Sequence, residues 1–204
     1  MSEALQLWFI RHGETAWSLT GQHTGRTDLP LTPHGEAMAR ALAPVWRHLD
    51  FQHVLSSPRL RARRTCELAG LGEQAQIEPD LAEWDYGDYE GLRTPEIQAL
   101  RPGWDVWADG CPGGEAPTAV QARADRLIQR LCGLRGPVAL FSHGQFGRAL
   151  AARWIGLPMR QGQHFAIAPA SIGVLGFEEG HEQRRVVALW NAQAGGPGAG
   201  LVKL

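Results

Sequence analysis

Residues 5–15 have the sequence LQLWFIRHGET, in which an apolar run ends abruptly in a cation, an imidazole and a glycine. An apolar run of about six residues that is bounded by a turn signal is typical of a buried strand. Ligands of open α/β sheets bind beyond the carboxyl ends of the strands. The stretch therefore predicts that Arg11 and His12 are delivered to a binding site.

Length and composition indicate one soluble domain with an ample core. The chain has 204 residues and a formal net charge of −1, so it offers no field for a polyanion and we expect no nucleic-acid partner. Its three cysteines form no Cys-x-x-Cys pair, which argues against a disulfide framework or a zinc site and predicts a reducing compartment. The first residues lack a secretory signal pattern, and no apolar run approaches the roughly 20 residues that span a bilayer. We therefore expect a cytoplasmic protein with no membrane partner.

Helix and strand signals alternate along the chain. Strands are expected at residues 5–10, 53–56, 75–78, 137–141, 164–168 and 171–177, with an edge strand at 184–190. Helices are expected to begin at Thr32-Pro33, at Ser57-Pro58, at Thr118 and after Gly144. The first of these helices is expected to run to about residue 49, and Pro44 is a candidate for a kink within it. In a capping box, Gln121 would complement Thr118.

Two segments break this alternation. Residues 80–117, called the excursion below, are rich in tryptophan, proline and glycine and predict an irregular, lid-like region with one short helix from Thr94-Pro95 to Pro102. Residues 194–204 are glycine-rich and predict a flexible C-terminal tail. A single domain over residues 1–193 is therefore expected.

The alternation of strands and helices predicts a three-layer α/β/α fold, with a mostly parallel central sheet and an antiparallel edge strand. Two of the expected strands end alike, one in Arg11-His12-Gly13 and the other in Ser142-His143-Gly144. Because parallel strands put their carboxyl ends at one edge of a sheet, we expect His12 and His143 to meet there.

The residues expected at this edge suit a phosphate monoester dianion. Arg11 and Arg61 are permanent cations whose forked donors match phosphate oxygens. Glu83 lies in an aromatic-rich loop that would desolvate its carboxyl, and desolvation raises a carboxyl pKa toward the range of a proton donor at neutral pH. Arg59, Arg63 and Arg64 are expected to be surface charges, with Arg59 the candidate exception.

These residues resemble a known family over nearly the whole chain. The motif at 11–15 looks like the signature of the histidine phosphatase superfamily, which includes cofactor-dependent phosphoglycerate mutases. Further matching pieces stand at 24–25, 31–32, 56–62, 83–91 and 142–144, in the family's order and spacing. Residues 84–91 and 109–111 further resemble a branch that contains acid phosphatases and fungal sedoheptulose bisphosphatase. The resemblance implies a phosphoglycerate mutase-like fold.

The resemblance also implies a role for each site residue. His12 would be the nucleophile and become a phosphohistidine, with Arg11, Arg61 and His143 forming the phosphate pocket. Glu83 would protonate the leaving alkoxide and then deprotonate the attacking water. The expected substrate-binding residues are Ser18, Thr24, Gly25, Tyr86 and Gly144; Ser18 stands where many members have Asn. No metal and no cofactor are implied.

Three functions remain open at this point. The favoured one is a metal-independent phosphatase that acts on a small phosphorylated metabolite, either a sugar phosphate or a broad range of esters. The second is a phosphoglycerate mutase, but mutases of the family carry a long insertion with extra arginines, whereas the short excursion contains only Arg93 and Arg101. The third is an inactive module that binds phosphorylated ligands. Family members are often dimers, so a homodimer is among the states that the resemblance implies.

Overall fold

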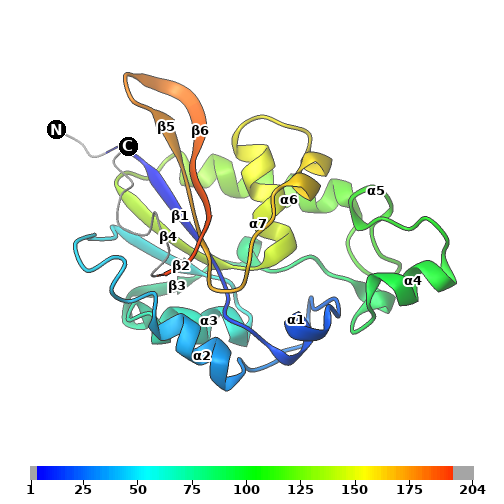
Figure 1. Ribbon diagram of the computed structural model, residues 1–204. Coiled ribbons are helices and arrows are strands. Elements are labelled where there is room, and N and C mark those ends of the chain that lie inside the picture. Colours follow the sequence, from blue (N-terminus) through cyan, green and yellow to red (C-terminus); the bar gives the residue numbers. More distant parts are fainter. Residues whose placement is uncertain (1–3, 195–204) are drawn as a thin grey trace.

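A six-stranded sheet forms the centre of the computed structural model, which describes residues 4–194 (Figure 1). Its strands are β1 (Gln6–Arg11), β2 (His53–Ser56), β3 (Ala75–Ile77), β4 (Pro137–Ser142), β5 (Ile172–Glu178) and β6 (His181–Ala192). Their order across the sheet is β3-β2-β4-β1-β5-β6. The pairs β3–β2, β2–β4 and β4–β1 are parallel, whereas β1–β5 and β5–β6 are antiparallel. The predicted mostly parallel sheet with antiparallel pairing at one edge is confirmed. Among the described strands β5 runs against the others, and β6, which is antiparallel to β5, runs in the same direction as β1.

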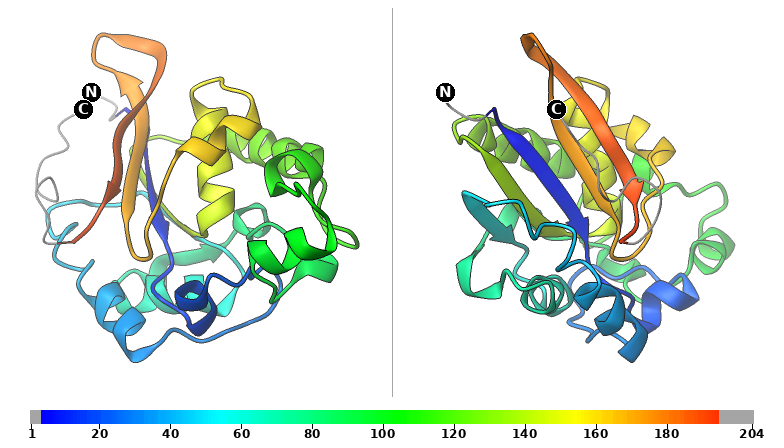
Figure 2. Two further views of the ribbon diagram at one scale, coloured as in Figure 1. Left: turned by 45° about the vertical axis from the view of Figure 1, so that its right-hand side comes forward. Right: turned by 60° about the vertical axis from the view of Figure 1, so that its left-hand side comes forward.

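Helices cover both faces of the sheet. The α-helices are α1 (Ala16–Thr20), α2 (Pro33–Arg40), α3 (Leu60–Leu68), α4 (Thr94–Leu100), α5 (Val106–Asp109), α6 (Pro117–Leu131) and α7 (Gly144–Trp154). Figures 1 and 2 show α2 and α3 on one side of the sheet and α6 and α7 on the other, while the turn between β5 and β6 projects beyond both layers.

Side chains of β1 alternate between the two cores that this arrangement creates. Leu7 and Phe9 pack in the core beneath α6 and α7, and Trp8 and Ile10 pack in the core beneath α3. Strand β4 is buried along its whole length, as expected of a central strand covered on both faces. The three-layer α/β/α prediction is confirmed.

Several expected element boundaries were wrong. Helix α2 ends at Arg40 rather than near residue 49, and turns follow over residues 41–48, where Pro44 has no backbone N–H to donate. Helix α6 begins at Pro117 after an N-cap at Ala116, so Thr118 does not cap it. The edge strand is longer than expected, and the short helices α1 and α5 and several 3₁₀ turns were not expected at all.

The strand expected at residues 164–168 is absent from the structure. A 3₁₀ helix, Met159–His164, ends there, and side chains of β6 take the backbone groups that a sheet would otherwise have paired. Trp190 Nε1 donates to the Ala166 carbonyl at 2.7 Å, and the Ala168 N–H donates to Asn191 Oδ1 at 2.7 Å. These contacts satisfy the segment without a ladder. Apart from Ala194, the expected tail lies outside the described residues.

Register across the sheet determines what its carboxyl edge presents. Arg11 pairs with Ser142 between β1 and β4, and Ser56 pairs with Phe141 between β4 and β2. The residues that directly follow these three strands therefore lie at the same edge of the sheet; they are His12 after β1, His143 after β4 and Ser57 after β2. The N–H of His12 donates to the Ser142 carbonyl at 2.9 Å, and this hydrogen bond links the ends of β1 and β4.

Candidate active site

The structure brings the two histidines together at the carboxyl edge of the sheet. The ring centroids of His12 and His143 lie 5.2 Å apart at an interplanar angle of 61°. His12 is 5% exposed and His143 is fully buried. We call Arg11, His12, Arg61 and His143 the sheet-edge group.

Hydrogen bonding fixes which nitrogen of His12 carries the proton. Its Nδ1 lies 2.7 Å from the Gly13 carbonyl oxygen, which can only accept, so Nδ1 is the protonated nitrogen and Nε2 keeps a lone pair. Burial lowers the pKa of His12 well below its usual value, and the positive charges of Arg61 and Arg11 lower it further. The imidazole is therefore neutral near pH 7 and has a free electron pair on Nε2.

Thr65 holds the backbone on which this arrangement depends. The Gly13 N–H donates to Thr65 Oγ1 at 3.0 Å, and that hydroxyl donates to the Arg61 carbonyl at 2.7 Å. Thr65 lies on α3 and is fully buried. It links the histidine turn to the helix that carries Arg61, and no motif in the sequence pointed to it.

Arg61 is fully buried and held by a cage of carbonyl groups. Its Nη1 donates to Thr27 O at 3.0 Å, and its Nη2 donates to Thr24 O at 2.9 Å and to Gly25 O at 3.1 Å. Burial lowers its pKa, but an arginine remains charged at any pH of interest. A desolvated guanidinium held by neutral carbonyls retains its charge for an anionic ligand.

Glu90 in turn fixes the loop that provides this cage. Its carboxylate accepts the N–H groups of Gly25 at 2.9 Å and Thr27 at 3.0 Å, and that of Arg26 at 3.3 Å. The loop therefore presents its N–H groups to Glu90 and its carbonyl groups to Arg61. The sequence marks Glu90 only as part of the motif at 83–91, because its role depends on contacts between residues that are about 65 positions apart in the chain.

The side chain of Arg11 lies against the N-terminus of α7. Its Nη1 donates to the Ile167 carbonyl at 2.6 Å. A β-carbon at Gly144 would stand 3.3 Å from the guanidinium carbon of Arg11, so glycine at this position lets the cation lie close against the backbone.

Unpaired donors converge on the sheet-edge group. Within residues 4–194, four buried side-chain nitrogens or oxygens have no hydrogen-bond partner: Nε of Arg11, Arg59 and Arg61, and Nδ1 of His143. Buried polar groups are almost always paired, and an orphaned one calls for a specific explanation. Three of the four are guanidinium N–H groups, which can only donate. Together they describe the binding environment of an oxyanion.

The acid sits beside this group, at the N-terminus of α7. Glu83 Oε1 accepts the N–H groups of Trp84 at 2.9 Å and Phe146 at 2.8 Å, and Oε2 accepts that of Gln145 at 3.0 Å. A helix N-terminus offers unpaired N–H groups to a carboxylate. Oε1 accepts two N–H groups, whereas Oε2 accepts only one and retains a lone-pair direction, so the carboxyl is oriented but not saturated.

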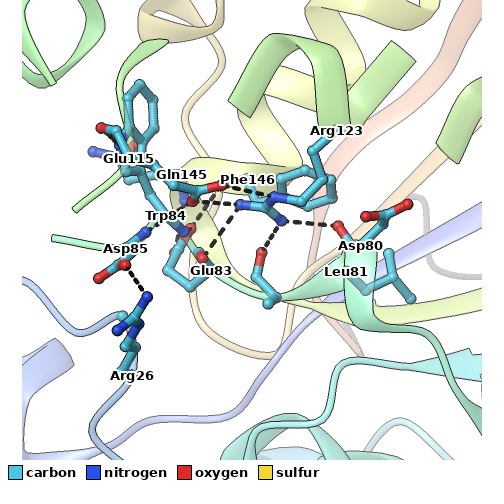
Figure 3. Close-up of polar contacts among 12 residues, drawn as sticks. Arg26, Asp80, Leu81, Glu83, Trp84, Asp85, Glu115, Arg123, Gln145 and Phe146 are labelled. Atoms are coloured by element: carbon cyan, nitrogen blue, oxygen red, sulfur yellow. Dashed lines mark hydrogen bonds and ion pairs between the residues drawn. The ribbon is translucent and has the colours of Figure 1, made fainter. Parts of the chain in front are cut away.

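Arg123 braces the segment that carries the acid, as Figure 3 shows. Its Nη1 donates to the carbonyls of Asp80 at 2.9 Å and Ala82 at 2.6 Å. Its Nε and Nη2 bond both carboxylate oxygens of Glu115, at 3.0 and 2.8 Å, and Nη2 also reaches the Glu83 carbonyl at 3.4 Å. Arg123 is 9% exposed. Helix α6 thus sets the path of the excursion.

A pocket of about 220 Å³ opens above the sheet-edge group. Of the expected site residues, those that line it are Arg11, His12, Ser18, Thr24, Glu83, Tyr86 and Gly144. Arg61, His143 and Gly25 are not on its wall. Ser18 already donates its hydroxyl proton to the Thr15 carbonyl at 2.9 Å, as part of the cap of α1.

Other lining residues were not expected as site residues. They include Trp17, Gln22, His23, Gln145 and Arg148. His23 stacks on Tyr86 with centroids 4.6 Å apart, and burial lowers the pKa of His23 to about 4. Burial also raises the pKa of Tyr86 well above its usual value, so both rings are neutral near pH 7. Their sequence neighbourhoods carry no periodic signal that would have placed them on one wall.

Comparison with known proteins identifies the family. A model of the histidine phosphatase superfamily (branch 1) matches residues 7–193. The chain belongs to the histidine phosphatase superfamily. This confirms the resemblance drawn from the motifs.

Relatives of this histidine phosphatase include enzymes with assigned activities. An acid phosphatase of Mycobacterium tuberculosis is 44% identical over 188 residues, which cover 90% of this chain and 92% of that protein. A sedoheptulose 1,7-bisphosphatase of Saccharomyces cerevisiae is 38% identical over 184 residues, covering 74% of this chain and 68% of the yeast protein. The solved structure of a functionally characterised open reading frame product of Mycobacterium tuberculosis matches with a TM-score of 0.87 and 42% identity, covering 93% of this chain and 98% of that one.

The described part of this histidine phosphatase shows neither a metal-binding cluster nor a membrane-spanning helix. Among residues 4–194, no group of three or more His, Cys, Asp or Glu side chains is arranged to hold a metal ion. None of the helices described over the same residues combines the length and apolar character needed to cross a bilayer.

Proposed function

We propose that this histidine phosphatase hydrolyses phosphate monoesters of small metabolites through a phosphohistidine on His12. The observation that carries the proposal is the unprotonated Nε2 of a buried, neutral His12 beside arginine Nε–H groups that have no partner in the part of the chain that the structure describes. The names of its relatives, acid phosphatase and sedoheptulose 1,7-bisphosphatase, support the same reaction class.

In the first step, His12 Nε2 attacks phosphorus and the bond from phosphorus to the ester oxygen breaks. The oxygen leaves as an alcohol after taking a proton from the Glu83 carboxyl. Arg11 and Arg61 neutralise the equatorial oxygens, which is the main task left to the protein in phosphoryl transfer. The Nδ1–H of His12 stays bonded to the Gly13 carbonyl, so the ring keeps its orientation as charge develops on it.

In the second step, water attacks the phosphohistidine on the face that the alcohol has left. The Glu83 carboxylate takes a proton from the water, the bond from Nε2 to phosphorus breaks, and inorganic phosphate departs. Splitting one displacement into two replaces a hard step with two easier ones. Both steps use protein groups already in place and end with His12 neutral again.

Small sugar phosphates, or a broad range of phosphate monoesters, are the substrates that we infer. A volume of about 220 Å³ suits a small metabolite, and the relatives' names include a sugar bisphosphatase. We further infer a cytoplasmic location, supported by three free cysteines, and a homodimer, which rests on the resemblance to dimeric family members.

The test is a phosphate-release assay over a panel of phosphorylated metabolites, with wild type and His12→Ala side by side. We expect release by the wild type, retained in EDTA, and its loss in His12→Ala. Rapid quenching into alkali should trap a phosphoryl group on wild-type histidine. The matched control is His34→Ala, which removes an exposed imidazole from α2. An undiminished His12→Ala enzyme, or a wild type that binds phosphate esters and releases none, would contradict the proposal.

The same chemistry could return the phosphoryl group to a substrate, as in a phosphoglycerate mutase. Such a reaction needs cations for the substrate carboxylate, and both arginines of the excursion are engaged elsewhere. Arg93 pairs with Glu96 at 3.0 Å and Arg101 pairs with Asp109 at 2.7 Å, and neither lines the pocket. We therefore expect phosphate release from 3-phosphoglycerate to exceed isomerisation, with or without a bisphosphoglycerate primer. Primer-dependent isomerisation faster than release would reverse this ranking.

A further inference from the structure

Ser57 makes a contact that the proposed reaction does not yet use. It is the first residue after β2, and its side chain is fully buried. Its Oγ lies 2.7 Å from Nε2 of His143, which follows the neighbouring strand β4. The Ser57 N–H donates to the Phe141 carbonyl at 2.9 Å, so sheet register holds the two residues in place. The sequence had suggested a helix cap for Ser57, but the N-cap of α3 is Arg59.

Counting protons around Ser57 Oγ shows which atom donates. A serine hydroxyl has one proton and two lone pairs. One lone pair accepts the Arg59 N–H at 3.2 Å. Among the residues that the structure describes, His143 Nε2 is the partner recorded for the remaining proton. If Nε2 carried a proton and donated instead, the hydroxyl proton would be buried with no acceptor, which is costly.

We propose that Ser57 is a positioning residue, whose hydroxyl donates to His143 Nε2 and so fixes the imidazole proton on Nδ1 as a donor to bound phosphate. The inference rests on the proposed function. Nδ1 is one of the four buried side-chain nitrogens without a partner among residues 4–194, together with Nε of Arg11, Arg59 and Arg61. A nitrogen that meets an oxyanion has to present N–H rather than a lone pair.

The two histidines are thereby held in opposite states by opposite partners. The Gly13 carbonyl can only accept, so it leaves His12 with a bare Nε2 that can attack phosphorus. The Ser57 hydroxyl donates to His143 Nε2 and leaves Nδ1–H to bind oxygen. Burial and the charge of Arg61 lower the pKa of His143 well below its usual value, in agreement with a neutral ring that carries one proton. The tautomer of each ring thus matches its task.

Imidazole nitrogen NMR tests this directly in the wild-type protein, because protonated and bare ring nitrogens resonate far apart. Spectra would be recorded with and without inorganic phosphate, and His143→Gln would assign the signals. We expect Nδ1 protonated and Nε2 bare in both states. A protonated Nε2 beside a bare Nδ1, or two protonated nitrogens with phosphate bound, would overturn the proposal. The readout does not depend on turnover, so it stays separate from any failure of the phosphatase reaction.

Kinetics provide the second test. Ser57→Ala removes the donor, so the proton of His143 redistributes to Nε2, and we expect kcat/KM for phosphate release to fall about 10- to 100-fold, the loss of roughly one oriented donor. Ser57→Thr keeps the hydroxyl and should restore kcat/KM to within a few-fold of wild type. Ser56→Ala is the matched control, since that buried hydroxyl donates to the Ser57 carbonyl at 3.1 Å and has no recorded bond to His143.

The combined outcomes separate positioning from structure. A Ser57→Ala protein with wild-type kcat/KM, or one whose His143 spectrum matches the wild type, would overturn the proposal. An equal loss in Ser56→Ala would also overturn it, because the effect would then reflect packing at the strand end.

Discussion

The sheet-edge group and the excursion contribute to the same pocket, but they are held in place in different ways. Three members of the sheet-edge group stand at strand ends whose register is fixed by the parallel ladder, and the fourth, Arg61, lies in the first turn of α3. Backbone carbonyls hold both of its arginines. The acid of the excursion comes from a segment of short 3₁₀ turns, oriented by the N-terminus of α7 and by an ion pair between the buried Arg123 and the partly buried Glu115. Regular structure therefore positions the charges that meet phosphate, and a side-chain network positions the group that moves the proton.

This difference has an energetic meaning. Desolvated cations that bond only neutral carbonyls retain most of their charge for a ligand, at the expense of stability in the free protein. The Arg123–Glu115 pair is neutralised internally and serves to fix geometry. Substitutions in the first region should therefore affect mainly the reaction, and substitutions of the brace should affect mainly the fold.

The largest expected effect is that of Arg61→Met, which removes a buried cation from the sheet-edge group. We expect kcat/KM for phosphate release to fall about 10³-fold, because charge that develops on the transferring phosphoryl oxygens loses a preorganised partner. Exposed Arg63, two positions along α3, provides the control variant Arg63→Met. A similar loss in both variants would mean that the general positive charge of α3, and not the cage around Arg61, matters for the reaction.

Glu83→Gln tests whether the excursion provides the proton. Loss of a general acid should lower kcat about 10²-fold for an alkyl phosphate. The loss should be much smaller for p-nitrophenyl phosphate, because its phenolate leaves without a proton. Glu73→Gln, a change at an exposed carboxylate, serves as the control. Equal losses on both substrates would show that Glu83 binds or organises the site without donating a proton.

Arg123→Met should act on stability more than on chemistry. It leaves the Glu115 carboxylate and the Asp80 and Ala82 carbonyls without their buried partner, which should cost about 3 kcal/mol of unfolding free energy. Urea denaturation measures this cost. Arg126 lies on the same helix as Arg123 but is exposed, and it pairs with Asp80. The comparison variant Arg126→Met should therefore change the urea midpoint little. If Arg126→Met were the more damaging change, the brace would be misassigned.

Glu90→Gln probes the link between the two regions, since Glu90 lies in the excursion and holds the loop that cages Arg61. The amide can accept from the loop N–H groups with one atom only, and its NH₂ opposes the others. We expect about a tenfold fall in kcat/KM, equivalent to the loss of about one hydrogen bond to a charged group. Glu96→Gln, which affects only a surface pair with Arg93, should leave kcat/KM unchanged. An unaffected Glu90→Gln enzyme would mean that the loop keeps its shape without the carboxylate.

The contrast between the sheet-edge group and the excursion also explains which site residues the sequence predicts and which it does not. Arg11, His12 and His143 follow apolar runs that are typical of strands, and parallel pairing of those strands predicts that the two histidines lie side by side. In the structure their ring centroids are 5.2 Å apart. Nothing comparable marks Arg123 or Glu90. The backbone carbonyls that Arg123 binds lie about 40 positions away along the chain, and the loop that Glu90 binds lies about 65 positions away. Their roles depend on how the excursion folds back over α6 and the loop at 24–27. Such contacts leave no periodic trace in the sequence.

The expected strand at 164–168 failed for a related reason. The composition of the segment fits a strand, but tertiary contacts override it: Trp190 and Asn191 of β6 take its backbone groups, and Ile167 offers its carbonyl to Arg11. A segment predicted as part of the sheet instead forms part of the pocket rim. Ser57 likewise has a position that the sequence pattern assigned to a helix cap, whereas the fold places its hydroxyl 2.7 Å from His143 Nε2.

The smallest predicted effect concerns pH, and it separates burial from charge within the sheet-edge group. Only neutral His12 can attack phosphorus, so activity is lost as the pH falls through its pKa, which burial, Arg61 and Arg11 lower. In Arg61→Met one cation is gone, so the pKa of His12 rises and the acid limb of kcat/KM moves to higher pH; the shift is partial, because burial remains the larger cause. The wild type and Arg61→Met are compared on the same substrate, because the second ionisation of the substrate phosphate then contributes equally to both pH profiles. Coincident acid limbs would mean that the cation does not set the protonation of the nucleophile, and the fall in rate in Arg61→Met would then be assigned to phosphate binding alone.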